Sequence, residues 1–568
     1  MQMYRSVIRS LTIRCSILML FMSLGCGGGS APDDNIFRYN EPSGIGSLDP
    51  AFINYQAAIW AGSQLYNGLV EADENEQIKP CIARSWSGDS TATVWTFNLR
   101  TDVFFHEDEC FGSARTRRLT ATDVKYSFER VCDARIKSAG QWIFRSTVDG
   151  AEAYIKATAA GESPVGIRGI TAPDDSTLVI RTAKPFAPFL SLLTTPFCWI
   201  VPKEATEFYK ERFAHHPVGS GPFRFLSWEQ DRDIRLKRNE RYFRFDDKGV
   251  RLPYLDGIKI SFIRSPKSEF FEFEQGRLDF VATIDNSVLE QVITPDGNLT
   301  PKFADYKQFR KAAQSVEYYG FLLDTAFTAA KNGPYSTSKV LRQALNYAID
   351  RDRIVRYVLR GRAVPAHNGI LPPSMPGFSP EVKGYDYNIQ KARELLLQAG
   401  YGPGKSLPPI TLQIGANERT ASVAEAVQQQ WKEIGLDARI VQVDFPRHLG
   451  MIRNSELPLW RTSWIADYPD PENFLALFYS KNASPAGPNT THFRNATFDS
   501  LYEQALSPKL NPAERYTLYN RMERIVIDDA PWIFLYHDVS LRLARPSVIG
   551  FRPESAGRLV LETVKKSR

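Results

Sequence analysis

The sequence predicts an α/β protein with more than one lobe. Strand-like stretches, in which apolar and polar residues alternate, occur in turn with helix-like stretches along most of the chain, and this order is typical of α/β folds. The 568 residues include 43% hydrophobic and 12% aromatic residues, enough for large buried cores. Because one core rarely organises more than about 250–300 residues, the chain should divide into lobes. No segment repeats at a spacing of about 20–50 residues, which argues against a solenoid.

Period-two alternation marks the predicted strands. VWTFNLRTDVFF (Val94–Phe105) has the pattern of a strand pair, and STLVIRT (Ser176–Thr182) has that of a single strand. A turn at GSGPF precedes the strand Asp233–Asn239, and DARIVQVDF (Asp437–Phe445) forms another strand. These strands lie between helical stretches, as an α/β chain requires.

Apolar residues at three- and four-residue spacing mark the predicted helices. One helix begins near Thr120 or Thr122, since either hydroxyl can cap a first turn. A single long amphipathic helix is predicted over Ser338–Leu359. Two further helices, Asn388–Gly400 and Ala421–Gly435, each end at a glycine, the residue that most often ends a helix.

The N-terminus has the features of a secretory signal. Three arginines precede the apolar run Cys15–Met22, which is shorter than the ~20 residues of a membrane-spanning helix. Ser23–Cys26 resembles the bacterial lipobox, although Ser23 stands where leucine is usual. The resemblance implies a signal peptide of residues 1–25 and a lipid on Cys26. We therefore expect a lipid-anchored protein of the periplasm or cell envelope, with an ordinary signal peptide as the alternative.

The charge pattern gives no sign of nucleic-acid binding. The formal net charge is +6, and removal of the three leader arginines lowers it to +3. Charged residues make up 24% of the chain, an ordinary fraction, and no block of like charge occurs. We expect a mixed, solvated surface and no nucleic-acid partner.

Four cysteines follow Cys26, and an exported protein allows them to form disulfides. They are Cys81, Cys110, Cys132 and Cys198. Three pairings are open to four cysteines, and we favour Cys81 with Cys110 because each lies at the edge of a strand–loop unit. No Cys-x-x-Cys occurs, so we expect neither a zinc site nor a redox site.

The sequence lacks the patterns of common enzymes. It contains no Gly-x-Ser-x-Gly, no His-Glu-x-x-His and no phosphate-cradling glycine loop. Its seven histidines are scattered and form no metal-ligand pattern. We therefore expect no catalysis, no metal and no cofactor.

A series of short sequence motifs, taken in their order along the chain, points to a family. Through these motifs the chain resembles the extracytoplasmic solute-binding proteins of peptide ABC importers, the oligopeptide- and dipeptide-binding family. The resemblance extends over residues 45–546. The matching phrases include SLDPA, LYNGLVEAD, IKPCIARSW, VWTFNLR, LTATDVKYSFERV, GSGPFRF, RNERYF, LPYLDGIKI, VLRQALNYAIDRDRIV, WKEIGLDA and WIADYPDP.

The resemblance implies a two-lobed periplasmic-binding-protein fold with a hinge and an extra domain inserted in the first lobe. Residues 316–319 and 536–539 would cross between the lobes, and closure around a ligand would occur about these crossings. The implied parts are lobe I (26–67, 190–316 and 540–568), the inserted domain (68–189) and lobe II (317–539).

The stretch WIADYPDPENF carries the main candidate residue, Asp467. From the residues alone, an aspartate before Tyr-Pro favours an Asx-turn that accepts backbone hydrogen bonds. The resemblance instead implies that Asp467 pairs with the free α-amino group of a bound peptide. Asp470 and Glu472 are expected to shape the following turn.

The resemblance also implies contacts to the backbone and side chains of a peptide. Ser463 and Ile465 would offer main-chain groups to the peptide as to an added strand. Trp464 would form the wall of a side-chain pocket, or else be an ordinary core tryptophan. Phe445 would line another pocket.

The partner of the peptide carboxylate stays open between two arginines. Arg461 matches an arginine that oligopeptide binders place near the C-terminus of the ligand, and a surface role is its alternative. Arg419 lies where dipeptide binders place a carboxylate-binding arginine. Asn54 and Tyr55 would contact the other edge of the peptide from lobe I.

Together, these features predict a monomeric, lipid-anchored protein that captures short peptides and delivers them to an ABC permease with separate ATPase subunits. The alternatives are the same scaffold with another cargo, namely a nickel chelate, haem or an oligosaccharide, or a signalling receptor. The implied Asp467 site favours a peptide, because a sugar has no ammonium group to pair with an acid.

Overall fold

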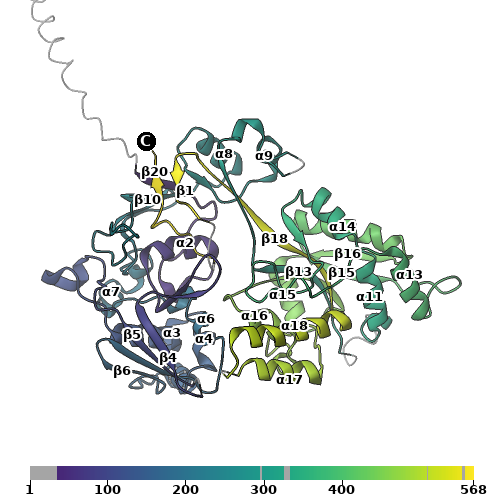
Figure 1. Cartoon of the computed structure of the whole chain (residues 1–568), viewed down its shortest axis with the longest axis horizontal. Helices are drawn as coiled ribbons and strands as arrows, with labels where there is room; N and C mark the ends of the chain where they lie inside the picture. Colours follow the sequence, from purple (N-terminus) through teal and green to yellow (C-terminus); the bar gives the residue numbers. More distant parts are fainter. Residues whose placement is uncertain are drawn as a thin grey trace, which may run out of the picture.

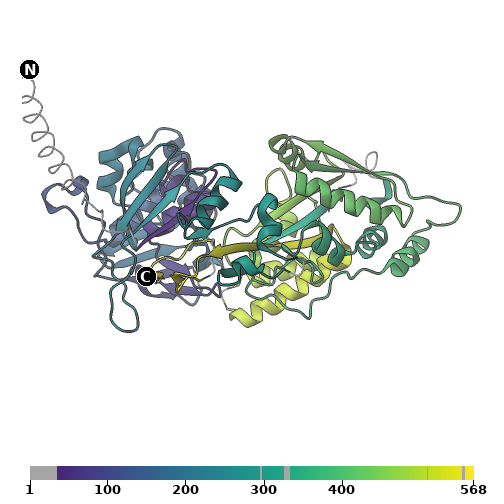
Figure 2. The same cartoon turned by 90° about the horizontal axis from the view of Figure 1, so that it is seen from above.

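The computed structural model describes residues 35–567 apart from 92, 295–296, 325–332, 508 and 553–556. Cys26 and the predicted signal peptide lie outside these residues. The described chain forms two lobes side by side, with the long strand β18 (Trp532–Ala544) extending from one to the other (Figures 1 and 2). Among the helices in this part of the chain, none combines the length and the apolar content that crossing a membrane requires.

Lobe I contains a four-stranded sheet in the order β1-β10-β9-β8, in which β1 runs parallel to β10. Its core gathers residues from both ends of the chain, among them Phe37, Trp60, Phe280 and Phe551. The elements are β1 (Ile36–Asn40), α2 (Gln56–Leu65), α7 (Lys203–Tyr209), β8 (Phe223–Glu229), β9 (Asp233–Arg238), β10 (Gly257–Ser261), α8 (Pro266–Glu274), β11 (Phe280–Val281), α9 (Asn286–Val292), β12 (Lys307–Ala312), β19 (Val548–Ile549) and β20 (Lys565–Lys566).

The inserted domain is built on a second four-stranded sheet, β4-β5-β7-β6. The predicted strand pair Val94–Phe105 is only half correct, because β5 ends at Leu99 and Phe104 forms an isolated bridge. The predicted helix start at Thr120 is confirmed by a capping box with Asp123. The elements are β2 (Val70–Ala72), β3 (Ile78–Pro80), β4 (Ala83–Gly88), β5 (Val94–Leu99), α3 (Ala121–Cys132), α4 (Gln141–Arg145), α5 (Ala151–Ala159), β6 (Ile170–Asp174), β7 (Thr177–Arg181) and α6 (Phe189–Leu192).

Lobe II places its sheet between two hydrophobic cores. Strand β13 contributes to both cores. Its Tyr319 and Phe321 pack into the core under α11, α13 and α14, whereas its Val316 and Tyr318 pack into the core with α16–α18. The elements are β13 (Ser315–Phe321), α11 (Lys339–Tyr347), α12 (Arg351–Arg353), β14 (Ala363–Pro365), α13 (Ile389–Gln398), β15 (Ile410–Gly415), α14 (Glu418–Lys432), β16 (Ala438–Val443), α15 (Phe445–Arg453), β17 (Leu459–Ile465), α16 (Glu472–Leu475), α17 (Ala496–Ala505) and α18 (Pro512–Asp529).

Strand β18 belongs to both lobes. Its first half pairs with β13 of lobe II, and its second half pairs with β12 and β11 of lobe I. The chain first crosses from lobe I to lobe II where β12 leads into β13, and it comes back through β18. At this crossing His537 Nδ1 lies 2.9 Å from the carbonyl oxygen of Ser315. Two adjacent extended segments therefore join the lobes, a geometry suited to a hinge. The domain boundaries given above stay predictions.

The predicted long helix Ser338–Leu359 is wrong, because the structure divides it. Helix α11 ends at Tyr347, and the Asp350 side chain accepts the Arg353 N–H at 2.9 Å to begin a new, short helix. Buried Arg351 donates to the carbonyl oxygens of Asn346 at 3.1 Å and Phe534 at 2.6 Å. The break thus satisfies helix-end groups that a continuous helix would bond internally.

The predicted pairing of Cys81 with Cys110 is also wrong. All four described cysteines are free thiols. Cys81 is buried in the core of the inserted domain, where its sulfur accepts a hydrogen bond from Arg244 Nη2 at 3.3 Å, whereas Cys110 packs against the core of lobe I. Burial raises the pKa of the Cys81 thiol to about 12, so the thiolate required for disulfide exchange is scarce.

Glu523 of α18 gives lobe II a pH-dependent stability. Burial raises the pKa of this carboxyl group to about 8, although the Leu371 N–H donates to it at 3.1 Å. The ordinary pKa of a glutamate is 4.5. Between that pH and about pH 8, Glu523 holds a proton in the folded state that it releases in the unfolded state. The free energy of unfolding should therefore fall as pH rises through this window, by up to a few kcal/mol.

A glutamine at this position removes the titration. We expect Glu523→Gln to be more stable than the wild type at pH 8 and to approach it at pH 4 in urea unfolding. Glu425→Gln, which changes an exposed glutamate of α14, is the matched control and should follow the wild type at both pH values. An unchanged pH profile in Glu523→Gln would show that another group carries the effect.

Candidate functional site

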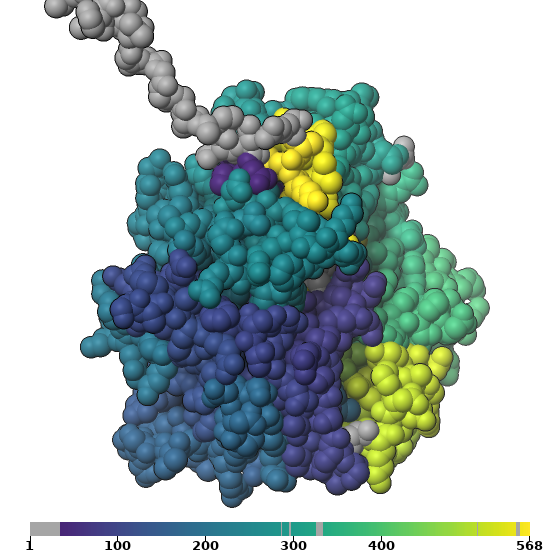
Figure 3. All heavy atoms as spheres, turned by 60° about the vertical axis from the view of Figure 1, so that its left-hand side comes forward, coloured from purple at the N-terminus to yellow at the C-terminus, as the bar shows by residue number. Residues whose placement is uncertain are grey.

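The two lobes face each other across a furrow, visible in Figure 3 between the early and late parts of the chain. Away from the connecting strands, lobe II touches the inserted domain. The Trp142 ring of the inserted domain stacks on Tyr468 of lobe II with ring centroids 6.3 Å apart, and the Ala187 N–H donates to the Leu506 carbonyl at 3.2 Å. Tyr468 is 7% exposed and packs into the core of the inserted domain. The end of β17 therefore lies where lobe II meets the inserted domain.

Asp467 stands at this junction, directly before Tyr468. Its carboxylate accepts one hydrogen bond, from Asn473 Nδ2 at 3.4 Å, and makes no ion pair with any described residue. One side is open to solvent, yet the protein around it removes enough water to raise the pKa of the carboxyl group. Asp467 is thus a partly desolvated acid without a cation, an arrangement that favours a positively charged ligand group.

Asn473 was not among the predicted residues, although it positions two of them. Its Oδ1 accepts the backbone N–H of Asp467 at 3.2 Å and the Trp464 indole N–H at 2.8 Å. Asn473 is 5% exposed. The only signal in the sequence is an amide six residues after the acid, which is too weak to single out.

The turn after Asp467 is held by other acids. The Asp470 carboxylate accepts the Glu472 N–H at 3.0 Å and pairs with Arg515. Buried Glu472 accepts the hydroxyls of Tyr468 and Tyr502. The prediction that Asp470 and Glu472 shape the turn is confirmed, and the Asx-turn role considered for Asp467 is absent from the described hydrogen bonds.

Strand β17 has a free edge beside Asp467. The Ala466 N–H donates to Gln314 O at 2.8 Å, so even-numbered residues of β17 point their backbone groups at β13. Backbone groups of Ser463 and Ile465 therefore point away from β13. On that side β15 pairs with β17 only at Trp460. The structure places Ser463 and Ile465 where an added strand could bond to them.

Trp464 and Phe445 lie in different surroundings. Trp464 is half-buried and packs against a core of lobe II, which is the ordinary core role considered for it. Phe445 begins α15, contacts Gly415 and is 49% exposed. Its neighbour His448 lies 2.8 Å from the Arg461 carbonyl oxygen, so α15 and β17 are connected. Phe445 is thus available to a ligand, whereas Trp464 is available only in part.

Both predicted carboxylate-binding arginines contact acids of this chain. Arg461 Nη2 contacts Glu317 Oε2 of β13, and the two side chains are 16% and 7% exposed. Arg419, in the first turn of α14, contacts Asp538 of β18, and both of these side chains are about one-third exposed. Glu317 and Asp538 were not predicted, because 144 and 119 residues separate them from their partners.

Asn54 and Tyr55 remain in lobe I, where both are exposed. The Tyr55 hydroxyl accepts the Gly46 N–H at 2.6 Å. No hydrogen bond or ion pair between described residues connects either side chain to β17. Their predicted contact with a ligand would require the lobes to approach.

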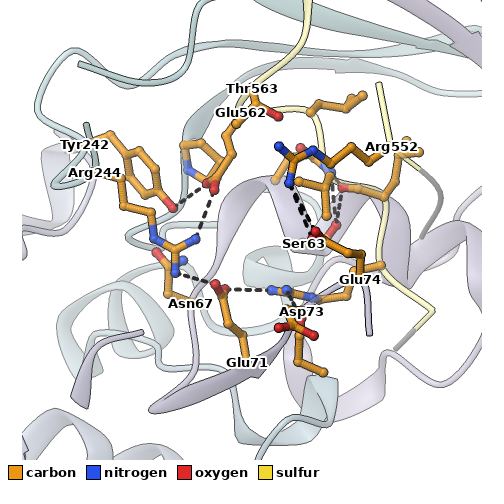
Figure 4. Close-up of a pocket in the computed structure, with 17 residues that line it drawn as sticks. Ser63, Asn67, Glu71, Asp73, Glu74, Tyr242, Arg244, Arg552, Glu562 and Thr563 are labelled. Carbon is orange, nitrogen blue, oxygen red and sulfur yellow. Dashed lines mark hydrogen bonds and ion pairs between the residues drawn. The ribbon is translucent and has the colours of Figure 1, made fainter. Parts of the chain in front are cut away.

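A separate cavity of about 170 Å³ lies between lobe I and β2 of the inserted domain, beside the C-terminal segment (Figure 4). Arg244 forms ion pairs with Glu71 at 2.8 Å and Glu562 at 2.9 Å, and the Tyr242 hydroxyl donates to Glu562 at 2.8 Å. Arg558 pairs with the same Glu71 at 3.1 Å. Because these charges compensate one another, we assign the cluster to docking of the C-terminal segment. Within the described chain, no group of three or more His, Cys, Asp and Glu side chains is arranged to hold a metal ion.

Comparisons with known proteins place the chain among binding proteins. The model of "Bacterial extracellular solute-binding proteins, family 5 Middle" matches residues 77–486. "Heme-binding protein A" of Haemophilus influenzae is 30% identical over 534 residues, 91% of this chain and 90% of that protein. The "Dipeptide-binding protein" of Escherichia coli is 27% identical over 510 residues, 88% of each. The structure of HbpA2 from Haemophilus parasuis has the same fold, with a TM-score of 0.79 and 24% identity over 94% of this chain and 100% of that chain.

Proposed function

Because this chain belongs to the family 5 bacterial extracellular solute-binding proteins, we propose that it captures short peptides between its lobes and delivers them to an ABC permease. The family is one of solute-binding proteins rather than enzymes. A ligand held in the furrow touches both lobes only when they approach, so binding and closure about β18 would be one event. ATP hydrolysis belongs to separate subunits of the transporter.

One observation supports a peptide cargo above the others. Among the described residues, the Asp467 carboxylate has no cationic partner, and it lies beside a strand edge where the backbone groups of Ser463 and Ile465 point away from β13. A peptide supplies both missing partners, an ammonium group at its N-terminus and a backbone that can extend a sheet. At an effective dielectric constant near 20, an ion pair at ~4 Å gains ~4 kcal/mol before desolvation is subtracted. Such a site would select for a free N-terminus and would not discriminate between side chains.

The cellular setting follows from the N-terminus. A lipid on Cys26 would hold the protein at a membrane surface. The protein would work as a monomer in the periplasm or cell envelope.

The main rival is another cargo on the same scaffold. The relative from Haemophilus influenzae is named for haem, so fold and family leave the ligand open. Haem has no ammonium group, and it would be expected to bind through an axial ligand and charged partners for its carboxylates. The unpaired acid at Asp467 favours the peptide.

Calorimetry tests the proposal. The purified protein is unfolded and refolded to remove carried cargo, then titrated with a mixed tripeptide library and with its N-acetylated copy. We expect the free-amine library alone to bind. Equal binding of both libraries would remove Asp467 from amine recognition, and binding of neither, together with a haem absorption change, would replace peptide by haem.

A proline in β17 tests the role of the free edge. Ser463→Pro removes an N–H that points away from β13, so the fold should persist while peptide affinity falls by about tenfold, the value of roughly one main-chain hydrogen bond. Thr462→Pro is the matched control, since the Thr462 N–H bonds to β13 and its loss should destabilise lobe II by at least the ~1 kcal/mol of a hydrogen bond. Unchanged affinity in a folded Ser463→Pro protein would place the peptide elsewhere.

A further inference from the structure

Two neighbouring strands place a carboxylate against Arg461. Glu317 of β13 stands opposite Ser463 of β17, and Tyr319 stands opposite Arg461, so the Glu317 and Arg461 side chains are diagonal neighbours on one face of the sheet. Arg461 Nη2 contacts Glu317 Oε2. The Glu317 side chain is 7% exposed, and Arg461 is its one hydrogen-bond partner among the described residues.

Arg461 and Asp467 lie at opposite ends of the free edge of β17. A strand advances ~3.3 Å per residue, so about 20 Å of backbone separates them. A peptide with its amine at Asp467, lying antiparallel to β17, would bring its C-terminus near Arg461 when it has about four to six residues. This step rests on the proposed function.

We propose that Glu317 is an internal competitor for the C-terminal carboxylate of the cargo. A peptide of suitable length displaces Glu317 from Arg461, and the displaced Glu317 binds a proton from solvent. One arginine–carboxylate pair replaces another, and the one proton taken up neutralises the displaced acid. The reason is burial, since a carboxylate that loses its single partner in a water-poor place is more stable protonated.

The surroundings of Glu317 agree with this exchange. Burial raises the pKa of its carboxyl group to about 7, although Arg461 opposes the shift. Above pH 7, Glu317 is therefore ionised before a peptide binds, and displacement takes up a proton. Below about pH 6 it is already protonated, so the uptake disappears. The titratable or charged groups around it are Arg461, Arg419, Asp538, Tyr536, Tyr318 and Tyr319.

Proton uptake measured by calorimetry tests the exchange. Free-acid and C-terminally amidated copies of peptides of three to six residues are titrated in two buffers of different ionisation enthalpy, at about pH 8 and about pH 6. The amidated copies account for protons bound by the peptide amine and by Asp467. At pH 8 we expect the longer free acids to take up about one more proton per peptide than their amides, and at pH 6 no difference.

Variants of Glu317 and Arg461 provide a second test. Glu317→Gln should bind free acids about tenfold more tightly than the wild type at pH 8 and lose the extra proton uptake. Arg461→Met should bind acids and amides alike. Asp529→Asn, which removes the acid of another arginine pair in lobe II, should leave both measurements unchanged. Thermal unfolding checks that each variant is folded.

Two results would overturn the inference in distinguishable ways. If peptides bind but acids and amides take up the same number of protons at pH 8, Glu317 does not exchange with the cargo, and the proposed function stands. If neither acids nor amides bind to the wild type, the proposed function and the exchange fall together.

Discussion

The Asp467→Asn variant should bind free-amine peptides about 100-fold more weakly than the wild type, a loss of about 2.7 kcal/mol. Asparagine keeps the shape of the side chain and its contact with Asn473 but removes the charge, so the loss measures the ion pair with the peptide ammonium. N-acetylated peptides, which carry no ammonium group, should bind both proteins with equal weakness. Isothermal titration calorimetry with one peptide and its acetylated copy makes the comparison.

The pH profile of the same interaction identifies the acid. The pKa of Asp467 is raised above its ordinary value of 3.8, so affinity should fall with decreasing pH sooner than for a solvated aspartate. It should also fall above about pH 8, where the peptide amine loses its proton. Asp467→Asn should lack the acid limb, and Asp437→Asn, at an exposed position of lobe II, should retain it. An acid limb that persists in Asp467→Asn would assign amine binding to another carboxylate.

Local patterns in the sequence predicted much of the fold, because hydrophobic periodicity and caps act over a few residues. Strand β16 and the helix after Thr120 follow their patterns. The long helix over Ser338–Leu359 failed because its apolar spacing continues through a break that depends on Asp350 and on carbonyl groups of β18. The cap from Asp350 is local, but the β18 carbonyl group that holds Arg351 is a tertiary partner, and hydrophobic periodicity does not report such a contact.

In the candidate site, too, local features could be predicted and tertiary contacts could not. Ser463, Ile465 and Asp467 are close in sequence, so a strand followed by a turn could be predicted to bring them together. The ion pair of Arg461 with Glu317 could not be predicted, since it depends on how β13 and β17 align. In the sequence Arg461 has no visible partner, whereas in the fold it forms an ion pair with Glu317. The surroundings of a proposed ligand-binding residue therefore depend on strand alignment, which no short stretch of sequence contains.

Arg244 should contribute strongly to the stability of lobe I. Its guanidinium lies between Glu71 and Glu562, and Glu562 belongs to the C-terminal segment (Figure 4). Arg244→Met keeps most of the side-chain volume but leaves two largely buried carboxylates with less compensation. We expect the free energy of unfolding to fall by about 3–5 kcal/mol, the usual cost of removing one partner from a buried ion pair. Urea unfolding followed by circular dichroism measures the change.

Two further variants separate charge from packing at this position. Arg277→Met removes an arginine whose pair with Glu272 is largely exposed, so the free energy of unfolding should stay close to that of the wild type. Adding Glu562→Gln to Arg244→Met should recover part of the loss, because one of the two carboxylates is then neutral. If the double variant is no more stable than Arg244→Met, lost packing rather than uncompensated charge explains the effect. Recovery would mean that Arg244 holds the C-terminal segment, and with it the end of the chain that leaves β18, onto lobe I by charge.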